Sequence, residues 1–174
     1  MGEIITPVTS TLYGAAHNKY LPNADHSISI PANILGKITM TKLTGSCLCG
    51  SVSYVADGEI KLTMNCHCTS CQTLTGSVYG TNLFFAEDDL TVTGELNTYQ
   101  HKSDRGSTMT RYFCPKCGTQ IYGTNSGREG VVTLRAGSVQ QKDEIKPSVN
   151  IYCDSAVPST AMDSNLKTFA KMPT

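Results

Sequence analysis

The sequence reads Gly45-Ser-Cys47-Leu-Cys49-Gly50 and, later, Cys114-Pro-Lys-Cys117-Gly118, two cysteine pairs that are each followed by glycine. In a strand, residues i and i+2 point to the same face about 6.6 Å apart, so Cys47 and Cys49 can direct their sulfurs at one ion, whereas a disulfide between them would close a strained ring. Cys114 and Cys117 flank a tight turn, and Gly118 permits the backbone that turns amides toward the sulfurs. The two pairs therefore predict a closed, tetrahedral structural zinc site that fixes the fold.

Cys114 and Cys117 have one alternative interpretation, a thioredoxin-like redox pair. That motif belongs at the start of a helix in a βαβ unit, and the sequence around these cysteines shows no such unit. The zinc interpretation is therefore preferred.

A third cluster, Cys66-His67-Cys68-Thr-Ser-Cys71, holds three thiols in one motif. Cys66, Cys68 and Cys71 can come from a strand end and the helical turn after it, which leaves the fourth position of a tetrahedral zinc open, as in catalytic sites. The alternative is a second structural zinc closed by a distant side chain, or a group of reduced thiols without metal. The residues that could close the site are Cys153, His67 and His101.

Charge indicates what an open site would do. A zinc ion with three thiolates carries about −1, so it should acidify water and polarise a carbonyl less than a zinc held by three histidines. It suits thiol chemistry better, because an incoming thiol would be held as a thiolate below its free pKa of roughly 8.5, beside an electrophile. The residues therefore predict a thiol substrate.

The composition is typical of a small globular protein. The 174 residues fit one domain. Fourteen Lys and Arg balance fourteen Asp and Glu, so no global positive field favours nucleic acid or anionic lipid. With 39% hydrophobic and 16% charged residues the chain is too apolar for disorder, and no apolar run reaches the roughly 18 residues of a membrane span. Eight cysteines are too few for a short disulfide scaffold.

The first 39 residues differ from the rest. They mix Thr, Ser, Asn, Pro and Gly without a sustained period, and they lack the pattern of a secretory signal. We expect a cytoplasmic protein with reduced thiols, in which residues 1–39 form an extension and residues 40–174 the zinc-binding domain. The extension would drape over the domain or reach a neighbouring subunit, which would make a homo-oligomer.

From residue 40 onward the pattern is strand and turn. Ser51-Val-Ser-Tyr-Val-Ala56 alternates as a half-buried strand does, and Gly58 predicts the turn of a hairpin to residues 60–64. One short helix is expected after Cys68, capped by Thr69 or Ser70 and ended by Gly76. Further runs rich in β-branched and aromatic residues are 78–85, 90–93, 96–101, 108–113, 120–122, 131–136 and 149–152. These regularly spaced strands predict an all-β fold.

Three stretches resemble the glutathione-dependent formaldehyde-activating enzyme family, also called the centromere protein V/GFA domain. They are Gly45-Ser-Cys47-Leu-Cys49-Gly50-Ser-Val-Ser-Tyr54, the Cys66 to Cys71 cluster with Gly76 after it, and Phe113-Cys114-Pro-Lys-Cys117-Gly118-Thr119, and the resemblance spans about residues 43–158. It implies a β-tent of antiparallel sheets with two zinc ions. The structural zinc would be bound by Cys47, Cys49, Cys114 and Cys117, and the second by Cys66, Cys68 and Cys71.

The resemblance also implies an activity. The family's named reaction adds glutathione to formaldehyde and gives S-hydroxymethylglutathione, and it is classed with the carbon–sulfur lyases in the reverse direction. Ser159 departs from the family, whose members commonly carry a tryptophan after the proline that Pro158 matches. This departure motivates a second hypothesis, a zinc lyase or isomerase that acts on a non-glutathione metabolite. A third is a non-catalytic zinc module that binds protein.

Several residues outside the clusters receive structural interpretations. Cys153 is expected to be a buried, inert thiol. His67 is expected to lie beside the ligands or in solvent, without a catalytic role. The arginines, which could pair with substrate carboxylates, are expected to be surface charges; they are Arg105, Arg111, Arg128 and Arg135.

Overall fold

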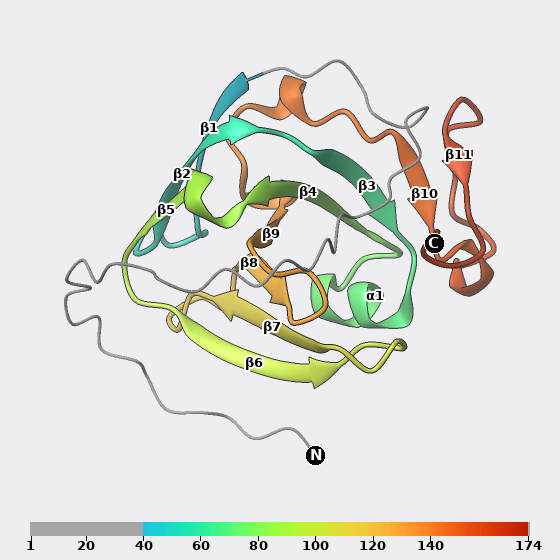
Figure 1. Ribbon diagram of the computed structural model, residues 1–174, viewed down its shortest axis with the longest axis horizontal. Coiled ribbons are helices and arrows are strands. Elements are labelled where there is room, and N and C mark those ends of the chain that lie inside the picture. The colour runs from blue at the N-terminus through green and yellow to red at the C-terminus, as the bar shows by residue number, and fades with distance from the viewer. Residues whose placement is uncertain (1–39, 174) are drawn as a thin grey trace, which may run out of the picture.

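The computed structural model of the protein describes residues 40–173 (Figure 1). The expected extension, residues 1–39, lies outside the described residues. Within them the chain forms eleven strands in two sheets and one α-helix, which follows Cys68. The prediction of an all-β fold with antiparallel sheets and one short helix is confirmed. No helix in this part of the chain is long and apolar enough to cross a membrane.

The smaller sheet has the order β1-β2-β5, and the larger has the order β11-β10-β3-β4-β9-β8-β7-β6. In the smaller sheet β1 spans Met40–Ser46, β2 Ser53–Glu59 and β5 Leu90–Thr93. The strands of the larger sheet are β3 Leu62–Cys66, β4 Gly80–Ala86, β6 Asn97–Lys102, β7 Thr108–Phe113, β8 Gln120–Asn125, β9 Val131–Arg135, β10 Val149–Ile151 and β11 Lys167–Thr168. The helices are α1 Thr69–Thr75 and four short 3₁₀ turns, Glu87–Asp89, Ala136–Ser138, Lys142–Glu144 and Cys153–Ser155. The seven strand runs expected between residues 78 and 152 coincide with β4 to β10.

The expected hairpin around Gly58 is wrong. β2 pairs with β1 and β5, and Gly58 lies inside the strand opposite Thr41. A Cβ atom on Gly58 would lie 2.1 Å from Oδ2 of Asp89, so this glycine allows a side chain to approach the strand rather than a turn to form. After Glu59 the chain crosses to the other sheet, where β3 pairs with β4 and β10.

Two pairings in the larger sheet are parallel, β10 with β3 and β11 with β10. Figure 1 shows β10 and β11 together beyond the edge of β3, with α1 following the end of β3. The register sets Ile151 opposite Cys66, the last residue of β3. The parallel pairing therefore brings the C-terminal part of the chain beside the third cysteine cluster.

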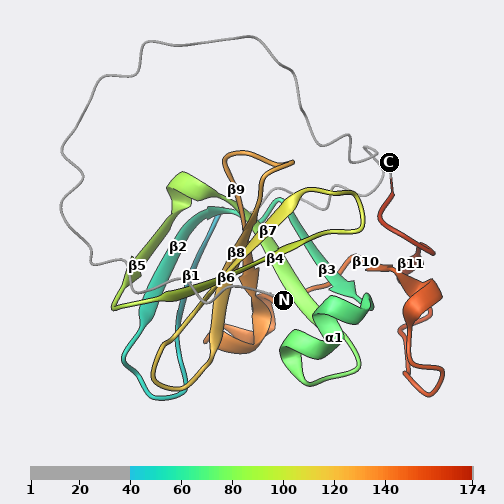
Figure 2. The same ribbon diagram turned by 90° about the horizontal axis from the view of Figure 1, so that it is seen from below.

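The core has two parts, and β4 contributes to both because successive side chains on a strand face opposite ways. Leu83 and Phe85 belong to the larger part, which lies between the sheets and also contains Cys47 and Cys114. Phe84 belongs to the smaller part, which contains Cys66 and Cys71. Each cysteine cluster is thus anchored in a hydrophobic core. Figure 2 shows the smaller sheet and the larger sheet side by side, with α1 below β3 and β4.

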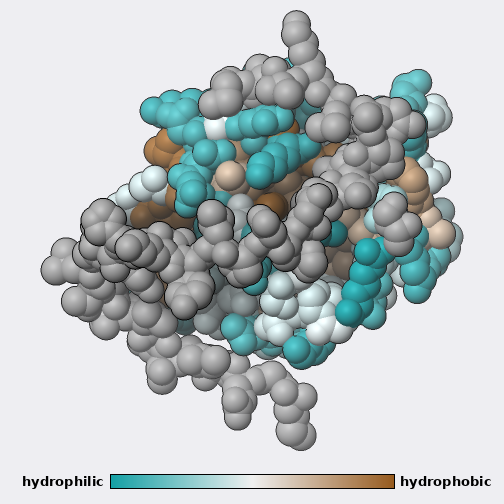
Figure 3. Space-filling model, in the orientation of Figure 1, coloured by the Kyte–Doolittle hydropathy of each residue, from teal (hydrophilic) through white to brown (hydrophobic). Residues whose placement is uncertain are grey.

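Large hydrophobic side chains that are exposed are few among the described residues, namely Leu48 and Val78. On the face drawn in Figure 3, hydrophobic residues lie interspersed among hydrophilic ones.

Candidate active site

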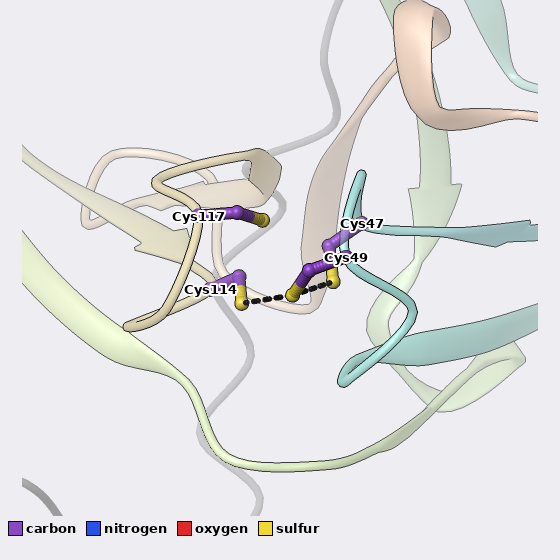
Figure 4. Close-up of side chains that lie close together, drawn as sticks. All are labelled: Cys47, Cys49, Cys114 and Cys117. Atoms are coloured by element: carbon purple, nitrogen blue, oxygen red, sulfur yellow. Dashed lines mark hydrogen bonds between the residues drawn. The ribbon is translucent and has the colours of Figure 1, made fainter.

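The first cysteine cluster forms at the meeting of two loops (Figure 4). Cys47 and Cys49 follow β1, and Cys114 and Cys117 follow β7; their four sulfur atoms all lie within 4.8 Å of one another. The Sγ atom of Cys49 is 3.5 Å from that of Cys47 and 3.7 Å from that of Cys114. A tetrahedral zinc with Zn–S bonds of about 2.3 Å needs sulfurs about 3.8 Å apart, so this donor set fits such an ion.

Thr119 ties the two loops together. Its hydroxyl accepts a hydrogen bond from the backbone N–H of Leu48 at 3.1 Å, and it lies 3.2 Å from the Sγ atom of Cys117. Hydrogen bonds from the hydroxyl and the backbone N–H of Thr119 lower the pKa of the Cys117 thiol to about 5. Gly50 and Gly118 both have φ above +70°, a conformation that glycine adopts without strain. The glycine after each pair therefore shapes its loop, as the sequence predicted for Gly118.

The second cluster spans a strand end and a helix start. The Sγ atoms of Cys66, Cys68 and Cys71 lie within 4.8 Å of one another. Cys68, rather than Thr69 or Ser70, is the N-cap of α1, because its Sγ atom accepts a hydrogen bond from the N–H of Cys71 at 3.4 Å. The helix ends at Gly76 with φ 64°, as expected. One cysteine therefore both caps the helix and belongs to the cluster.

The thiols of the second cluster have pKa values that are shifted in opposite directions. Hydrogen bonds from the thiols of Cys66 and Cys68 lower the pKa of the Cys71 thiol, and the charges of Arg135 and Arg111 act in the same direction. Hydrogen bonds with Cys68 and Cys71, together with burial, raise the pKa of the Cys66 thiol. The two guanidinium charges favour the thiolate form of Cys71, and the thiolate is the form of cysteine that binds a metal ion.

None of the three residues that could close the second cluster does so in the described part of the chain. No sulfur, histidine nitrogen or carboxylate oxygen of residues 40–173 joins Cys66, Cys68 and Cys71 within 4.8 Å. His67 is buried, with 1% of its surface exposed, and its Nε2 atom lies 3.4 Å from Oδ1 of Asn150. His67 therefore packs against β10 and does not lie in solvent. Cys153 is partly exposed and lies in neither cluster.

A cavity of about 270 Å³ opens beside the second cluster. Its walls include Cys66, Cys68 and Cys71 together with His101, Arg111 and Arg128. The expectation that the arginines are surface charges is wrong for Arg111 and Arg135, which are only 6% and 5% exposed. Arg105 also lines the cavity; it is exposed and donates from Nη2 to the backbone oxygen of Met172 at 2.6 Å.

Arg111 determines which ring nitrogen of His101 carries the proton. The Nε–H group of Arg111 donates to Nε2 of His101 at 3.4 Å, so that nitrogen is an acceptor and Nδ1 carries the proton, which points to the backbone oxygen of Lys102 at 3.1 Å. Burial lowers the pKa of His101, and the positive charge of Arg111 acts in the same direction. His101 is therefore neutral in the cavity wall.

The buried arginines have no acidic partner. Arg135 donates from Nη1 to Oδ1 of Asn82, and its Nε and Nη2 atoms have no hydrogen-bond partner. Within residues 40–173 no carboxylate oxygen lies within 4.0 Å of a guanidinium nitrogen of Arg111 or Arg135. Two guanidinium charges without a carboxylate partner therefore act on the second cysteine cluster.

Arg111 could have been found in the sequence. It lies two residues after Met109 on β7, and both side chains line the cavity because residues i and i+2 of a strand share a face. A positive charge in the inward-facing positions of a strand is uncommon unless it is paired. Arg135, the last residue of β9, follows the buried Leu134 and gives no such periodic signal.

The fold and the site define a mostly β protein with two cysteine groups that could each hold a metal ion. The model of one protein family, described as glutathione-dependent formaldehyde-activating enzyme, matches residues 42–155, and the chain belongs to this family. None of the curated proteins compared matches the sequence. A crystal structure of a Rhodobacter sphaeroides protein, a structural genomics target, is similar with 18% identity and a TM-score of 0.45, over 60% of this chain and 96% of that one.

Proposed function

We propose that this protein is a zinc-dependent enzyme of the carbon–sulfur lyase type, which adds a thiol such as glutathione to formaldehyde or another small carbonyl compound. In this proposal a structural zinc is held by Cys47, Cys49, Cys114 and Cys117. The second zinc is held by Cys66, Cys68 and Cys71 and keeps one open position. Residues 40–174 form the zinc-binding domain, and residues 1–39 are an extension of it.

The observation that carries the proposal is the convergence of three thiols on the wall of a cavity, without a fourth ligand among residues 40–173. In the site of four thiols, sulfur atoms would fill all four positions of the ion, whereas here only three thiols are present and the cluster lines a cavity. Zinc bound to the three thiols would supply a positive charge that holds an incoming thiol as a thiolate. The family to which the chain belongs supports glutathione and formaldehyde as the reactants.

The reaction forms one S–C bond. The sulfur of the thiol attacks the carbonyl carbon, the C=O double bond becomes a single bond, and the thiol proton ends on the former carbonyl oxygen. Thiol and aldehyde thus give a hydroxyalkyl thioether with no atom or electron left over. The reverse reaction breaks the same S–C bond, which is the lyase direction.

The protein's own charges favour a thiolate in this place. Three thiolates with one zinc ion carry about −1, and a fourth thiolate would raise the negative charge of a partly buried site. Arg111 and Arg135 supply two positive charges that no carboxylate of the described residues neutralises. The incoming thiolate therefore leaves the region close to neutral rather than strongly negative.

The first test is the native mass of the purified protein with and without millimolar glutathione. Two zinc ions plus one bound glutathione are the expected result. A protein with one zinc ion would overturn the assignment of the second site. Two zinc ions that ignore glutathione would exclude glutathione as the thiol.

The second test is the variant Cys68→Ser, which removes one thiol and keeps a good N-cap residue at the start of α1. We expect one zinc ion, no turnover of glutathione with formaldehyde, and a folded protein by circular dichroism. Cys153→Ser is the matched control, because Cys153 lies outside both clusters, and it should keep both ions and full activity. Full activity of Cys68→Ser would contradict the proposal.

A further inference from the structure

Three neighbouring strands, β10, β3 and β4, form the floor of the cavity beside the second cysteine cluster (Figure 1). Met64 and Cys66 share one face of β3, about 6.6 Å apart, because residues i and i+2 of a strand point the same way. The register sets Ile151 of β10 opposite Cys66. It sets Asn82 of β4 opposite Met64, and Phe84 follows two residues later on the same face. All five residues line the cavity.

The apolar residues of this floor pack in one group with the cysteines. Met64, Phe84 and Ile151 belong to the same hydrophobic core group as Cys66 and Cys71. Each of the three is buried, so packing holds its side chain in place. These three side chains, named the apolar floor from here on, therefore form a fixed hydrocarbon surface beside the thiols.

The polar groups of the cavity are engaged or lie on other elements. Asn82 accepts a hydrogen bond from Nη1 of Arg135 and donates from Nδ2 to the backbone oxygen of Gly80 at 3.0 Å. No charged residue of β3, β4 or β10 lines the cavity. The charged residues of its wall come from β7, from loops and from the turn Cys153–Ser155. A ligand group that lies on the apolar floor therefore meets hydrocarbon.

The apolar surface continues beyond the sheet. Met172 and Tyr152 are half-buried, pack against the same core group and line the cavity. Methionine is unbranched and polarisable, so its side chain adapts to ligands of different shape. The cavity thus offers a fixed apolar surface on the sheet and an adaptable one beside it.

Neither named reactant of the proposed reaction uses this surface. Formaldehyde has two heavy atoms and no hydrocarbon group, whereas the cavity measures about 270 Å³ and a water molecule takes only about 30 Å³ in the liquid. Glutathione is a polar peptide thiol whose only hydrocarbon parts are short methylene segments between polar groups. The apolar floor therefore fits a carbonyl compound that is larger and more apolar than formaldehyde.

We propose that the carbonyl substrate is an aldehyde with a hydrocarbon group of about three to six carbons, which lies on the apolar floor while the carbonyl carbon faces the second cysteine cluster. The sulfur of the thiol adds to that carbon, the C=O double bond becomes a single bond, and the thiol proton ends on the oxygen. The hydrocarbon group is unchanged in the product. This inference rests on the proposed function and adds the class of its electrophile.

The first test measures how the rate depends on the length of the aldehyde, by exchange NMR spectroscopy with glutathione as the thiol. Propanal, butanal, pentanal and hexanal differ only in methylenes remote from the carbonyl, so their uncatalysed rates are similar. Burial of one methylene predicts about a fourfold gain in kcat/KM, so hexanal should exceed propanal by about sixtyfold. If all four aldehydes react equally well, the apolar substrate is wrong and the proposed function stands.

Variants assign the preference to the cavity wall. Met172→Gln keeps the length of a half-buried side chain and adds an amide, so the ratio of hexanal to propanal should fall to about tenfold or less. Met64→Gln makes the same change in the apolar floor, with circular dichroism to show that it folds. Met162→Gln is the matched control, because Met162 lies outside the cavity, and it should keep the full ratio. An undiminished ratio in Met172→Gln and folded Met64→Gln would contradict the assignment.

Binding without reaction separates the two proposals. Ketones add thiols far less readily than aldehydes, so 2-hexanone and 2-butanone report the binding of a hydrocarbon group in NMR titrations of the zinc-loaded protein. Two methylenes predict about fifteenfold tighter binding of 2-hexanone. If no aldehyde is turned over, the proposed function is wrong and the ketones decide alone: a preference for 2-hexanone keeps the apolar site, and equal affinities overturn it.

A series of thiols identifies which reactant lies on the apolar floor. With propanal as the electrophile, ethanethiol, propanethiol and butanethiol should show no gain in kcat/KM with length. A gain with the length of the thiol and none with the length of the aldehyde would overturn the proposal, because the floor would then bind the thiol.

Discussion

Gly45→Ala is a direct test of how the fold supports the first cysteine cluster. Gly45 lies opposite Tyr54 in the β1–β2 pair and also bridges to Val139. A Cβ atom at this position would lie 2.2 Å from Cζ and from the hydroxyl oxygen of Tyr54, and 2.4 Å from the backbone oxygen of Ser138. Tyr54 is only 3% exposed and cannot swing into solvent, and the oxygen of Ser138 belongs to the backbone.

The magnitude follows from these contacts. Overpacking a buried site lowers the free energy of unfolding by about 1–3 kcal/mol. The new methyl group of Gly45→Ala would clash on two sides, so we expect a loss of about 3 kcal/mol. For a protein of this size each kcal/mol corresponds to about 2–4 °C, so the melting temperature should fall by roughly 6–12 °C. The strand that moves ends just before Cys47, so release of zinc to a chelator should also become faster.

The assay is thermal unfolding of the zinc-loaded protein, followed by circular dichroism at a fixed zinc concentration. Gly137→Ala is the matched control, because a Cβ atom there would meet no atom within 4 Å and its φ is not positive. This control should change the free energy of unfolding by less than about 0.5 kcal/mol. Equal melting temperatures for the two variants would refute the packing argument.

Three further variants test single contacts. Tyr54→Phe removes the hydroxyl that donates to Oγ of Ser138 at 3.0 Å; the direction follows because the Ser138 hydroxyl itself donates to the backbone oxygen of Arg135. The free energy of unfolding in urea should fall by about 1 kcal/mol, and an unchanged urea midpoint would contradict this hydrogen bond. Thr119→Val removes the hydroxyl beside Cys117 and should weaken zinc binding about tenfold in a competition with a chelator, whereas unchanged affinity would mean that the hydroxyl does not support the ligand. Because burial lowers the pKa of His101, the unfolded chain binds a proton more readily than the folded one, and stability is lost as the pH falls below about 6.5. In His101→Gln this loss of stability at low pH should be smaller. The melting temperatures of the variant and the native protein should therefore converge or cross between roughly pH 7 and pH 5, and a difference that stays constant over this range would contradict the role of His101.

Local spacing explains why so much of the site could be predicted. Cys47 and Cys49 are two residues apart and Cys114 and Cys117 three apart, and each pair lies in a tight turn rather than in a strand. The N–H groups of Gly50 and Gly118 donate to the backbone oxygens of Cys47 and Cys114, so local backbone bonds bring the two cysteines of each pair together. The alternation of the strand runs is equally local, and β4 to β10 coincide with the runs expected from it. The sequence therefore predicts which residues form strands and which cysteines act together.

Strand partners are not local, and here prediction was wrong. Glycine is a residue typical of turns, but Gly58 lies inside a strand, where the close approach of the Asp89 side chain requires a glycine. That contact comes from a segment far along the chain. The parallel pairing that sets Ile151 opposite Cys66 also joins segments far apart in the sequence. No periodicity within either segment contains that information, because a strand's pattern shows which face is buried and not which strand lies beside it.

The arginines show what this means for function. The sequence composition does not distinguish an arginine on the surface from a buried one. Only the alternation of Met109 and Arg111 on β7 indicates that the Arg111 side chain faces inward. Burying a guanidinium costs several kcal/mol unless something pairs with it, and no carboxylate among residues 40–173 does so for Arg111. The partner must therefore be the thiolate group, a ligand, or both. The thiol cluster supplies part of this negative charge, because the charges of Arg135 and Arg111 lower the pKa of the Cys71 thiol and the same attraction stabilises the buried guanidinium groups.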